Sequence, residues 1–248
     1  MNFCNHEHPT VKAVAAKLRA QTEGGDDTTF AIAAFNWVRD EIKYVILADW
    51  TVPAEFTLES REGNCGTKAC LLSAILCAGG IKKDDIGFGV QWISTADEFF
   101  LVPEWVLKAC SKKSIHFTLI VKLKGMWTHL DTSLDSALAN GTASYVDWDT
   151  VTFDGKNHAV KGGHIDFDPD HVTFFPSIDE YMRKKSRVPV AFRHCFNVAL
   201  DYARNHGPKC TSKKDLRMQI EQYLTRSHRV ACQEVFSLLM RQPLMSKL

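Results

Sequence analysis

The sequence contains little cysteine, and no two cysteines form a C-x-x-C pair. Its 8 cysteines among 248 residues are far below the density of small disulfide-stabilised proteins. The lack of C-x-x-C pairs excludes the most common structural zinc motif. Cys70 and Cys77 lie in an apolar helical stretch, where buried thiols are usual. We therefore expect free, reduced cysteines.

Long apolar runs and an excess of charge of one sign are also missing. Residues 69–78 form the longest mainly apolar stretch, about half of a membrane span. Residues 1–8 have neither the basic nor the apolar region of a secretory signal. Lys and Arg number 30 and Asp and Glu 29, so no strong field attracts a nucleic acid. We expect a cytoplasmic protein without a nucleic-acid or membrane partner.

Helical and strand-like patterns occupy separate parts of the chain. Apolar residues recur at helical spacing toward both ends and alternate in the middle. We expect helices between 9 and 23, between 28 and 42, and at 65–78, 190–206, 213–224 and 228–242, with strands at 86–92, 114–123 and 126–134. Since 45% of the residues are hydrophobic, the chain can bury one sizeable core. This order of elements indicates an α+β fold.

The connections between these elements give more local expectations. Thr28 or Thr29 is expected to cap the second helix. Residues 49–64 are expected to form a polar, proline-containing connection. Residues 94–113 either form a wall of a substrate cleft or a packed surface loop with a short helix.

The region after the strands carries weaker signals. We expect a hairpin around Asp154 and Gly155, and a capping box formed by Ser177 and Glu180. Residues 164–171 superficially resemble a metal-binding loop. They lack the glycine and glutamate that a calcium loop needs at its sixth and twelfth positions, so we expect no metal site.

Cys65 is placed where a thiol can act as a nucleophile. Gly63 and Gly66 flank it, so the backbone can turn tightly, and the apolar helix starts at once. A cysteine in the first turn of a helix lies close to unpaired N–H groups and the positive end of the helix dipole, which favour a thiolate. The same N–H groups can hold the oxyanion of an acyl transfer. From spacing alone, a cysteine next to a helix start is more often a small buried residue, and this alternative stays open.

A thiol nucleophile needs an imidazole as its base, and the predicted strand register indicates His116. A two-residue hairpin turn at Lys124 and Gly125 places His116 and Asp131 on one face of the strand pair as diagonal neighbours. Diagonal side chains are about 7 Å apart at the backbone, within reach of a His–carboxylate hydrogen bond. A three-residue loop would turn Asp131 to the opposite face.

Four motifs are spread along the chain between residues 35 and 131. The run TLESREGNCGTKACLL at 57–72, followed by AGGI at 78–81, resembles the nucleophile segment of the transglutaminase-like superfamily. The upstream FNWVRDEIKY at 35–44 resembles the preceding helix, IHF at 115–117 the histidine strand, and WTHLD at 127–131 the aspartate strand. The resemblance covers roughly residues 10–185.

The resemblance implies a papain-like core in which the nucleophile helix packs on an antiparallel sheet, followed by C-terminal helices. It implies a catalytic triad of Cys65, His116 and Asp131. By looser analogy the Tyr44 hydroxyl lies near the oxyanion, although a tyrosine of the core fits equally well. We expect a catalytic domain at 1–185 and a helical extension at 186–248 packed on it.

The implied activity is acyl transfer or hydrolysis on an amide or thioester through an acyl-Cys65 intermediate. The expected partners are a small molecule or peptide that carries such a group, with or without an amine acceptor. No cofactor is expected. A cysteine peptidase, or a binding domain that keeps the fold without catalysis, stays open as an alternative.

Overall fold

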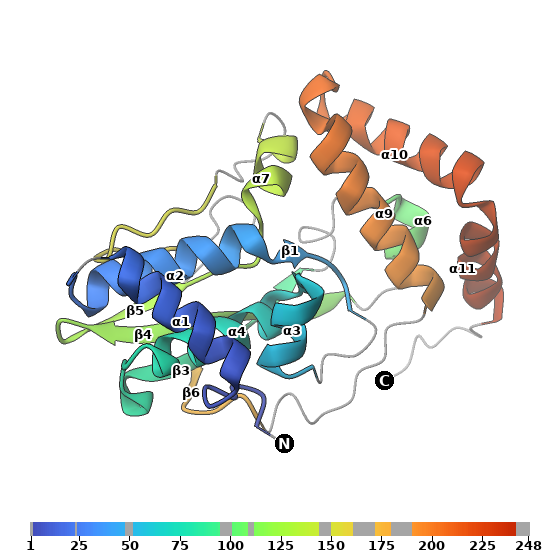
Figure 1. The fold of residues 1–248 in the computed structure, drawn as a ribbon. Coiled ribbons are helices and arrows are strands. Elements are labelled where there is room, and N and C mark those ends of the chain that lie inside the picture. Colours follow the sequence, from blue (N-terminus) through green and yellow to red (C-terminus); the bar gives the residue numbers. More distant parts are fainter. Residues whose placement is uncertain are drawn as a thin grey trace.

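The chain folds into an α+β structure, as the sequence predicts (Figure 1). The computed structural model describes residues 2–22, 24–47, 52–94, 101–108, 112–143, 150–160, 172–179 and 190–241. The N-terminal helices surround one central helix that packs on a four-stranded sheet, and the C-terminal helices form a group beside this part (Figure 1).

Among the described residues, four α-helices precede the strands of a four-stranded antiparallel sheet. The helices are α1 (Pro9–Gln21), α2 (Asp27–Glu41), α3 (Ala54–Ser60) and α4 (Cys65–Ala78). The strands are β3 (Ile86–Ser94), β4 (Lys113–Leu123), β5 (Met126–Leu130) and β6 (Thr173–Phe175), in the order β5-β4-β3-β6. A parallel pair, β1 (Lys43–Tyr44) and β2 (Glu62–Gly63), lies just before α4.

Helix α4 is the centre of the main core. Every residue from Cys65 to Leu76 is buried, because the helix is apolar on nearly all sides and is enclosed by α1, α2, α3 and β4. It ends at Gly79, where a Cβ atom would lie only 2.1 Å from the ring of Phe30. The predicted start and end of this helix are confirmed.

The hairpin between β4 and β5 has the predicted register. Leu123 pairs with Met126, and Lys124 and Gly125 form the turn with φ angles of 50° and 85°. The alternate residues of β4 from Phe117 to Leu123 therefore face the main core. Strand β5 ends at Leu130, earlier than expected, and Asp131 follows it.

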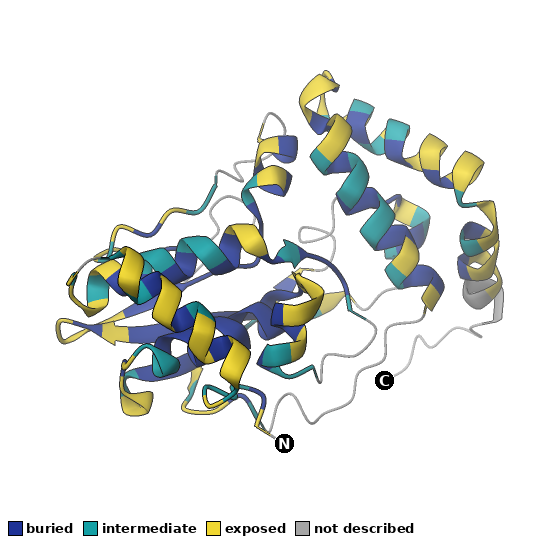
Figure 2. Ribbon diagram, in the orientation of Figure 1, coloured by how far each residue is buried: buried dark blue, intermediate teal, exposed yellow. Residues whose placement is uncertain are grey.

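A second core holds the C-terminal helices. They are α9 (Val190–His206), α10 (Lys213–Ser227) and α11 (Arg229–Arg241), with the 3-10 turn Gly207–Lys209 between the first two. Their apolar sides pack with α6 (Glu104–Leu107), α7 (Ser136–Thr142) and residues 101–102. Figure 2 shows the buried sides of α9 and α10 turned inward. The three predicted C-terminal helices are confirmed; the division at 185 stays a prediction.

Some local predictions were wrong. Asp26, not Thr28 or Thr29, caps α2, because its carboxylate accepts the N–H of Thr29 at 3.0 Å. The expected connection at 49–64 contains helix α3, whose first residue follows Pro53, a residue suited to a helix start. Within the described residues 150–160, the segment around Asp154 forms a turn and no hairpin: the carboxylate of Asp154 accepts the amides of Lys156 and Asn157, and Ala159 bridges to Leu130.

Other predictions are settled only in part. The short helix expected within 94–113 is α6, and Val106 on it is fully buried in the second core. Glu180 of the expected capping box and the 164–171 segment lie outside the described residues. The seven described cysteines are free thiols. Within the described residues, no helix is both long and apolar enough to cross a bilayer.

Candidate active site

Cys65 is the first residue of α4, at a helix start fixed by a capping box. The side chain of Asn64 accepts the N–H of Thr67 at 3.0 Å, and the Thr67 hydroxyl accepts the N–H of Asn64 at 3.0 Å. No described residue accepts a hydrogen bond from the amides of Cys65 and Gly66. These two N–H groups, at the positive end of the helix dipole, are therefore placed to bind an anion beside the thiol.

The chain approaches Cys65 through a tightly packed glycine. A Cβ atom at Gly63 would lie 2.8 Å from Oγ1 of Thr67 and 2.9 Å from Cγ of Lys68, so only glycine fits. Gly63 also pairs with Tyr44 across the two short parallel strands, and its carbonyl accepts the N–H of Val45 at 3.0 Å. The position of the nucleophile segment thus depends on the strand at 43–45.

His116 and Asp131 form a buried hydrogen-bonded pair. Nε2 of His116 lies 2.9 Å from Oδ2 of Asp131, and the side chains are only 2% and 3% exposed. The other oxygen of Asp131 accepts the N–H of Ser133 at 2.9 Å, and the N–H of Asp131 donates to the carbonyl of Ala159 at 2.7 Å. Both carboxylate oxygens are therefore satisfied, and Nδ1 of His116 is left for another partner.

The charges of the pair support each other. Burial by itself lowers the pKa of His116, but the charge and hydrogen bond of Asp131 and contact with the Cys65 thiol outweigh it and hold that pKa well above its usual value. Burial likewise raises the pKa of Asp131, but His116 and the donors at Ser133 bring it below its usual range. The structure thus brings His116 and Asp131 together as a buried pair, and the thiol of Cys65 contacts His116.

Lys68 is a buried amine one turn after Cys65. Its Nζ donates to the carbonyls of Arg39 at 3.1 Å, Ile42 at 2.6 Å and Ser133 at 3.2 Å. Burial lowers its pKa to about 7, although Asp135 and other nearby carboxylates oppose the change. Lys68 therefore ties the nucleophile helix to the end of α2 and to the turn after Asp131.

Lys68 is not among the residues that the sequence motifs identify as functional. The sequence does contain a signal for it. Lys68 lies in a helix that is apolar on nearly all sides, and a lysine in such a helix is expected to be buried and to need hydrogen-bond partners.

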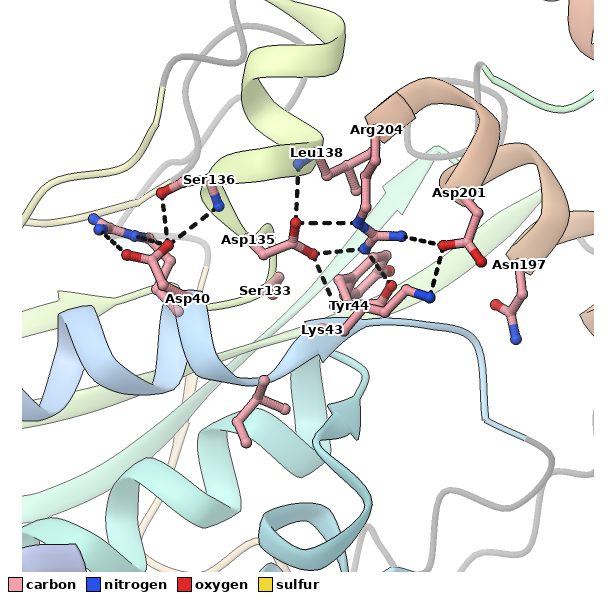
Figure 3. Close-up of polar contacts among 12 residues, drawn as sticks. Asp40, Lys43, Tyr44, Ser133, Asp135, Ser136, Leu138, Asn197, Asp201 and Arg204 are labelled. Carbon is pink, nitrogen blue, oxygen red and sulfur yellow. Dashed lines mark hydrogen bonds and ion pairs between the residues drawn. The ribbon is translucent and has the colours of Figure 1, made fainter. Parts of the chain in front are cut away.

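A second cluster of polar residues, formed by Asp135, Arg204 and the main chain of Tyr44, is drawn in Figure 3. Asp135, the N-cap of α7, accepts hydrogen bonds from the N–H of Leu138 at 2.9 Å and of Tyr44 at 3.0 Å. Arg204 of α9 pairs with both oxygens of Asp135 and donates to the carbonyl of Tyr44 at 2.6 Å. No local sequence pattern indicates Arg204, because its partners are 69 and 160 residues away in the chain.

Tyr44 is placed in the second core, with its side chain 4% exposed. Its main-chain N–H and carbonyl are bound by Asp135 and Arg204. The role of its hydroxyl at an oxyanion stays a prediction.

A histidine and a cysteine also lie next to each other on α9. His194 and Cys195 are adjacent on α9 but point to different partners: Nε2 of His194 lies 2.8 Å from Nδ1 of His228, and Cys195 contacts Cys232. Within the described part of the chain, no group of three or more His, Cys, Asp or Glu side chains is arranged to hold a metal ion.

The comparisons with known proteins agree with the core of this structure. Residues 12–132 match the family model described as the transglutaminase-like superfamily. No curated protein and no solved structure matches the chain. The matched residues run from α1 to just after β5 and include Cys65, His116 and Asp131. The chain therefore contains a transglutaminase-like domain, with an α+β core followed by C-terminal helices.

Proposed function

We propose that this protein is a thiol enzyme that transfers or hydrolyses the acyl group of an amide or thioester through an acyl-Cys65 intermediate. The observation that carries the proposal is the buried His116–Asp131 pair beside a cysteine at the first position of a helix. This combination supports the proposal, because acyl transfer by a thiol needs a base, a carboxylate that orients it and free amides around one cysteine.

In the first half of the reaction, the Sγ atom of Cys65 attacks the substrate carbonyl. Nδ1 of His116 accepts the thiol proton, since Nε2 is held by Asp131. The amides of Cys65 and Gly66 stabilise the negative oxygen of the tetrahedral intermediate. The intermediate collapses when the leaving amine or thiol takes the proton from His116, and a thioester on Cys65 remains.

In the second half, the acceptor attacks the thioester and gives its proton to His116. The thiol of Cys65 then leaves with that proton. A water acceptor gives hydrolysis and an amine acceptor gives a new amide. Asp131 keeps the imidazole oriented throughout and stabilises the imidazolium that forms. The proposed partners are therefore a small molecule or peptide with an amide or thioester group and an amine or water.

The first experiment compares the reactivity of the cysteines. Limited iodoacetamide near neutral pH, followed by peptide mapping, is expected to modify Cys65 before Cys4, although Cys4 is more exposed. The matched variant is His116→Gln, which removes the base and is expected to abolish this preference. Slow and unselective modification of Cys65 in the unaltered protein would contradict the proposal.

The second experiment detects the intermediate. Mixing the protein with 4-nitrophenyl acetate and measuring its intact mass is expected to show one added acetyl group, which Cys65→Ala lacks. Added methylamine accelerates loss of this group if the enzyme is a transferase, and leaves the rate unchanged if water is the acceptor. Turnover that survives in Cys65→Ala would rule out the mechanism.

A further inference from the structure

We propose that helix α9 contributes to the active site through Arg204, a positioning residue that fixes the segments carrying Cys65 and Asp131. Arg204 holds strand β1, which pairs with the segment leading into Cys65, and the residues after Asp131 in one fixed arrangement. This inference rests on the function proposed above and extends it to a part of the chain beyond residue 132, where the family match ends.

The contact between Arg204 and Asp135 is a buried, two-pronged ion pair. Nε lies 3.1 Å from Oδ1 and Nη2 lies 2.6 Å from Oδ2, and the side chains are 8% and 6% exposed. The planar guanidinium matches the carboxylate in direction as well as in charge, so this pair sets an orientation and not merely a distance. The adjacent Asp201 binds the remaining nitrogen at 3.0 Å.

Arg204 and Asp135 together enclose the main chain of Tyr44. Its N–H donates to Asp135 and its carbonyl accepts from Arg204, so both peptide groups are fixed by one ion pair (Figure 3). Because Tyr44 pairs with Gly63, the same contacts fix the segment that leads into Cys65.

Further contacts from α9 hold the same strand. Asn197 binds the main chain of Ile46 in both directions, accepting its N–H at 2.8 Å and donating to its carbonyl at 3.1 Å. Asp201 pairs with Nζ of Lys43 at 2.8 Å. Residues 43, 44 and 46 are thus all held by one face of α9. Apolar packing alone would attach the helix to the core without these hydrogen bonds and ion pairs.

The ion pair of Arg204 and Asp135 also fixes the segment that follows Asp131. Asp135 follows Asp131 by one short turn, and Lys68 holds the carbonyl of Ser133 between them from the nucleophile helix. The turn is therefore fixed from two sides, by Lys68 and by Arg204. Displacing it would move the carboxylate that orients His116.

The test uses variants of the full chain and reads the reactivity of Cys65. Arg204→Met alone leaves the carboxylate of Asp135 buried without its partner, which can prevent folding. The main variant is therefore Arg204→Met combined with Asp135→Asn, which removes both charges. The matched control is Arg193→Met, the same substitution elsewhere on α9 at a half-buried side chain with none of these contacts.

We measure the second-order rate of Cys65 alkylation by iodoacetamide from pH 6 to 9, below the unfolding temperature of each variant. The double variant is expected to react at least about tenfold more slowly near neutral pH, with a changed pH profile. Arg193→Met is expected to stay within about twofold of the unaltered protein. Arg204→Lys keeps the charge but not the fork and is expected to fall between them.

Guanidinium ion at low millimolar concentration provides a rescue experiment. It is expected to restore part of the alkylation rate in Arg204→Ala, where it refills the vacated site, and not in the double variant. A folded double variant whose alkylation profile equals that of the unaltered protein would overturn the positioning role of Arg204. The proposed function of Cys65 would not be affected by that result. A Cys65 that is no more reactive than Cys4 in the unaltered protein would overturn the proposed function, and this inference with it.

Discussion

Nε2 of His116, on strand β4, lies 2.9 Å from Oδ2 of Asp131, the residue that follows strand β5. The contact crosses the hairpin diagonally and is nearly sealed from solvent. Its geometry decides which nitrogen of the imidazole meets the substrate side, because Nε2 is occupied and Nδ1 is left for the thiol. The predictions below follow from this pair and from the charged groups packed around it.

Asp131→Asn is expected to slow the chemistry without unfolding the protein. The amide is similar in shape, but it carries no charge and can present an N–H to His116, which favours the wrong tautomer. We expect acyl transfer from 4-nitrophenyl acetate to fall by about 10²- to 10⁴-fold. The control is Asp84→Asn, at an exposed carboxylate next to the sheet, which leaves the rate unchanged. An Asp131→Asn protein that retains full activity contradicts the role of the pair.

The same pair predicts how stability depends on pH. The pKa of His116 is raised in the folded protein, so its contribution is complete below the unfolded value, about 6.5, and is lost as the pH rises through the folded value. The pKa of Asp131 is lowered, so its contribution is complete above about 3.9 and is lost at lower pH. The pair therefore stabilises the fold most between about pH 4 and 6.5.

Urea unfolding at a series of pH values measures this effect. The reference is the double variant His116→Gln with Asp131→Asn, in which neither group titrates. The difference in free energy of unfolding between the two proteins is expected to be largest in that interval and to decline on both sides. A difference that is flat from pH 4 to 9 would show that folding leaves the pKa of His116 near its unfolded value.

Much of the core could be predicted because its signals are local. The apolar run after Cys65, the glycines at its end and the two-residue turn at Lys124 each determine an element from a few neighbouring residues. The register of the hairpin then follows from the turn, and with it the meeting of His116 and Asp131. Sequence periodicity gives the strands and the turn fixes their pairing.

The rest could not be predicted because it depends on contacts far apart in the chain. Helix α3 is short, and its apolar residues are few, so the polar residues around it favoured a connection. Arg204 is one of several charged residues on an amphipathic helix, and only the folded chain shows that it meets Asp135. The cap of α2 was missed because Asp26, Thr28 and Thr29 are all suitable capping residues, and the fold selects among them.

Gly141→Ala tests how closely α7 and α9 must approach. A Cβ atom at Gly141 would lie 2.3 Å from the carbonyl oxygen of Ala203, and the main chain of Gly141 also contacts Gly207. Neither neighbour is the flexible end of a side chain, so the helices must move apart. We expect the free energy of unfolding to fall by about 1–3 kcal/mol, measured in urea.

The control for this substitution lies one position away. Asn140→Ala changes an exposed residue of α7 and is expected to alter stability by less than about 0.5 kcal/mol. If α9 is part of the active site, Gly141→Ala also lowers the rate of Cys65 alkylation. A stability unchanged by Gly141→Ala would mean that α7 and α9 are not in this close contact.

Lys68→Met is expected to change how stability responds to alkaline pH. Burial lowers the pKa of Lys68 to about 7 in the folded protein, whereas an unfolded lysine titrates near 10.4. Between these values the unfolded chain binds one more proton than the folded chain, so the folded state gains stability as the pH rises, by about 1.4 kcal/mol for each pH unit. Lys68→Met lacks this gain.

Urea unfolding from pH 7 to 10 is expected to show that the free energy of unfolding rises more steeply for the unaltered protein than for Lys68→Met. The control Lys17→Met, at an exposed lysine of α1, is expected to follow the unaltered protein. Parallel curves for the unaltered protein and Lys68→Met would mean that Lys68 keeps its proton when the chain folds, and that its three carbonyl contacts hold an ammonium ion throughout this pH range.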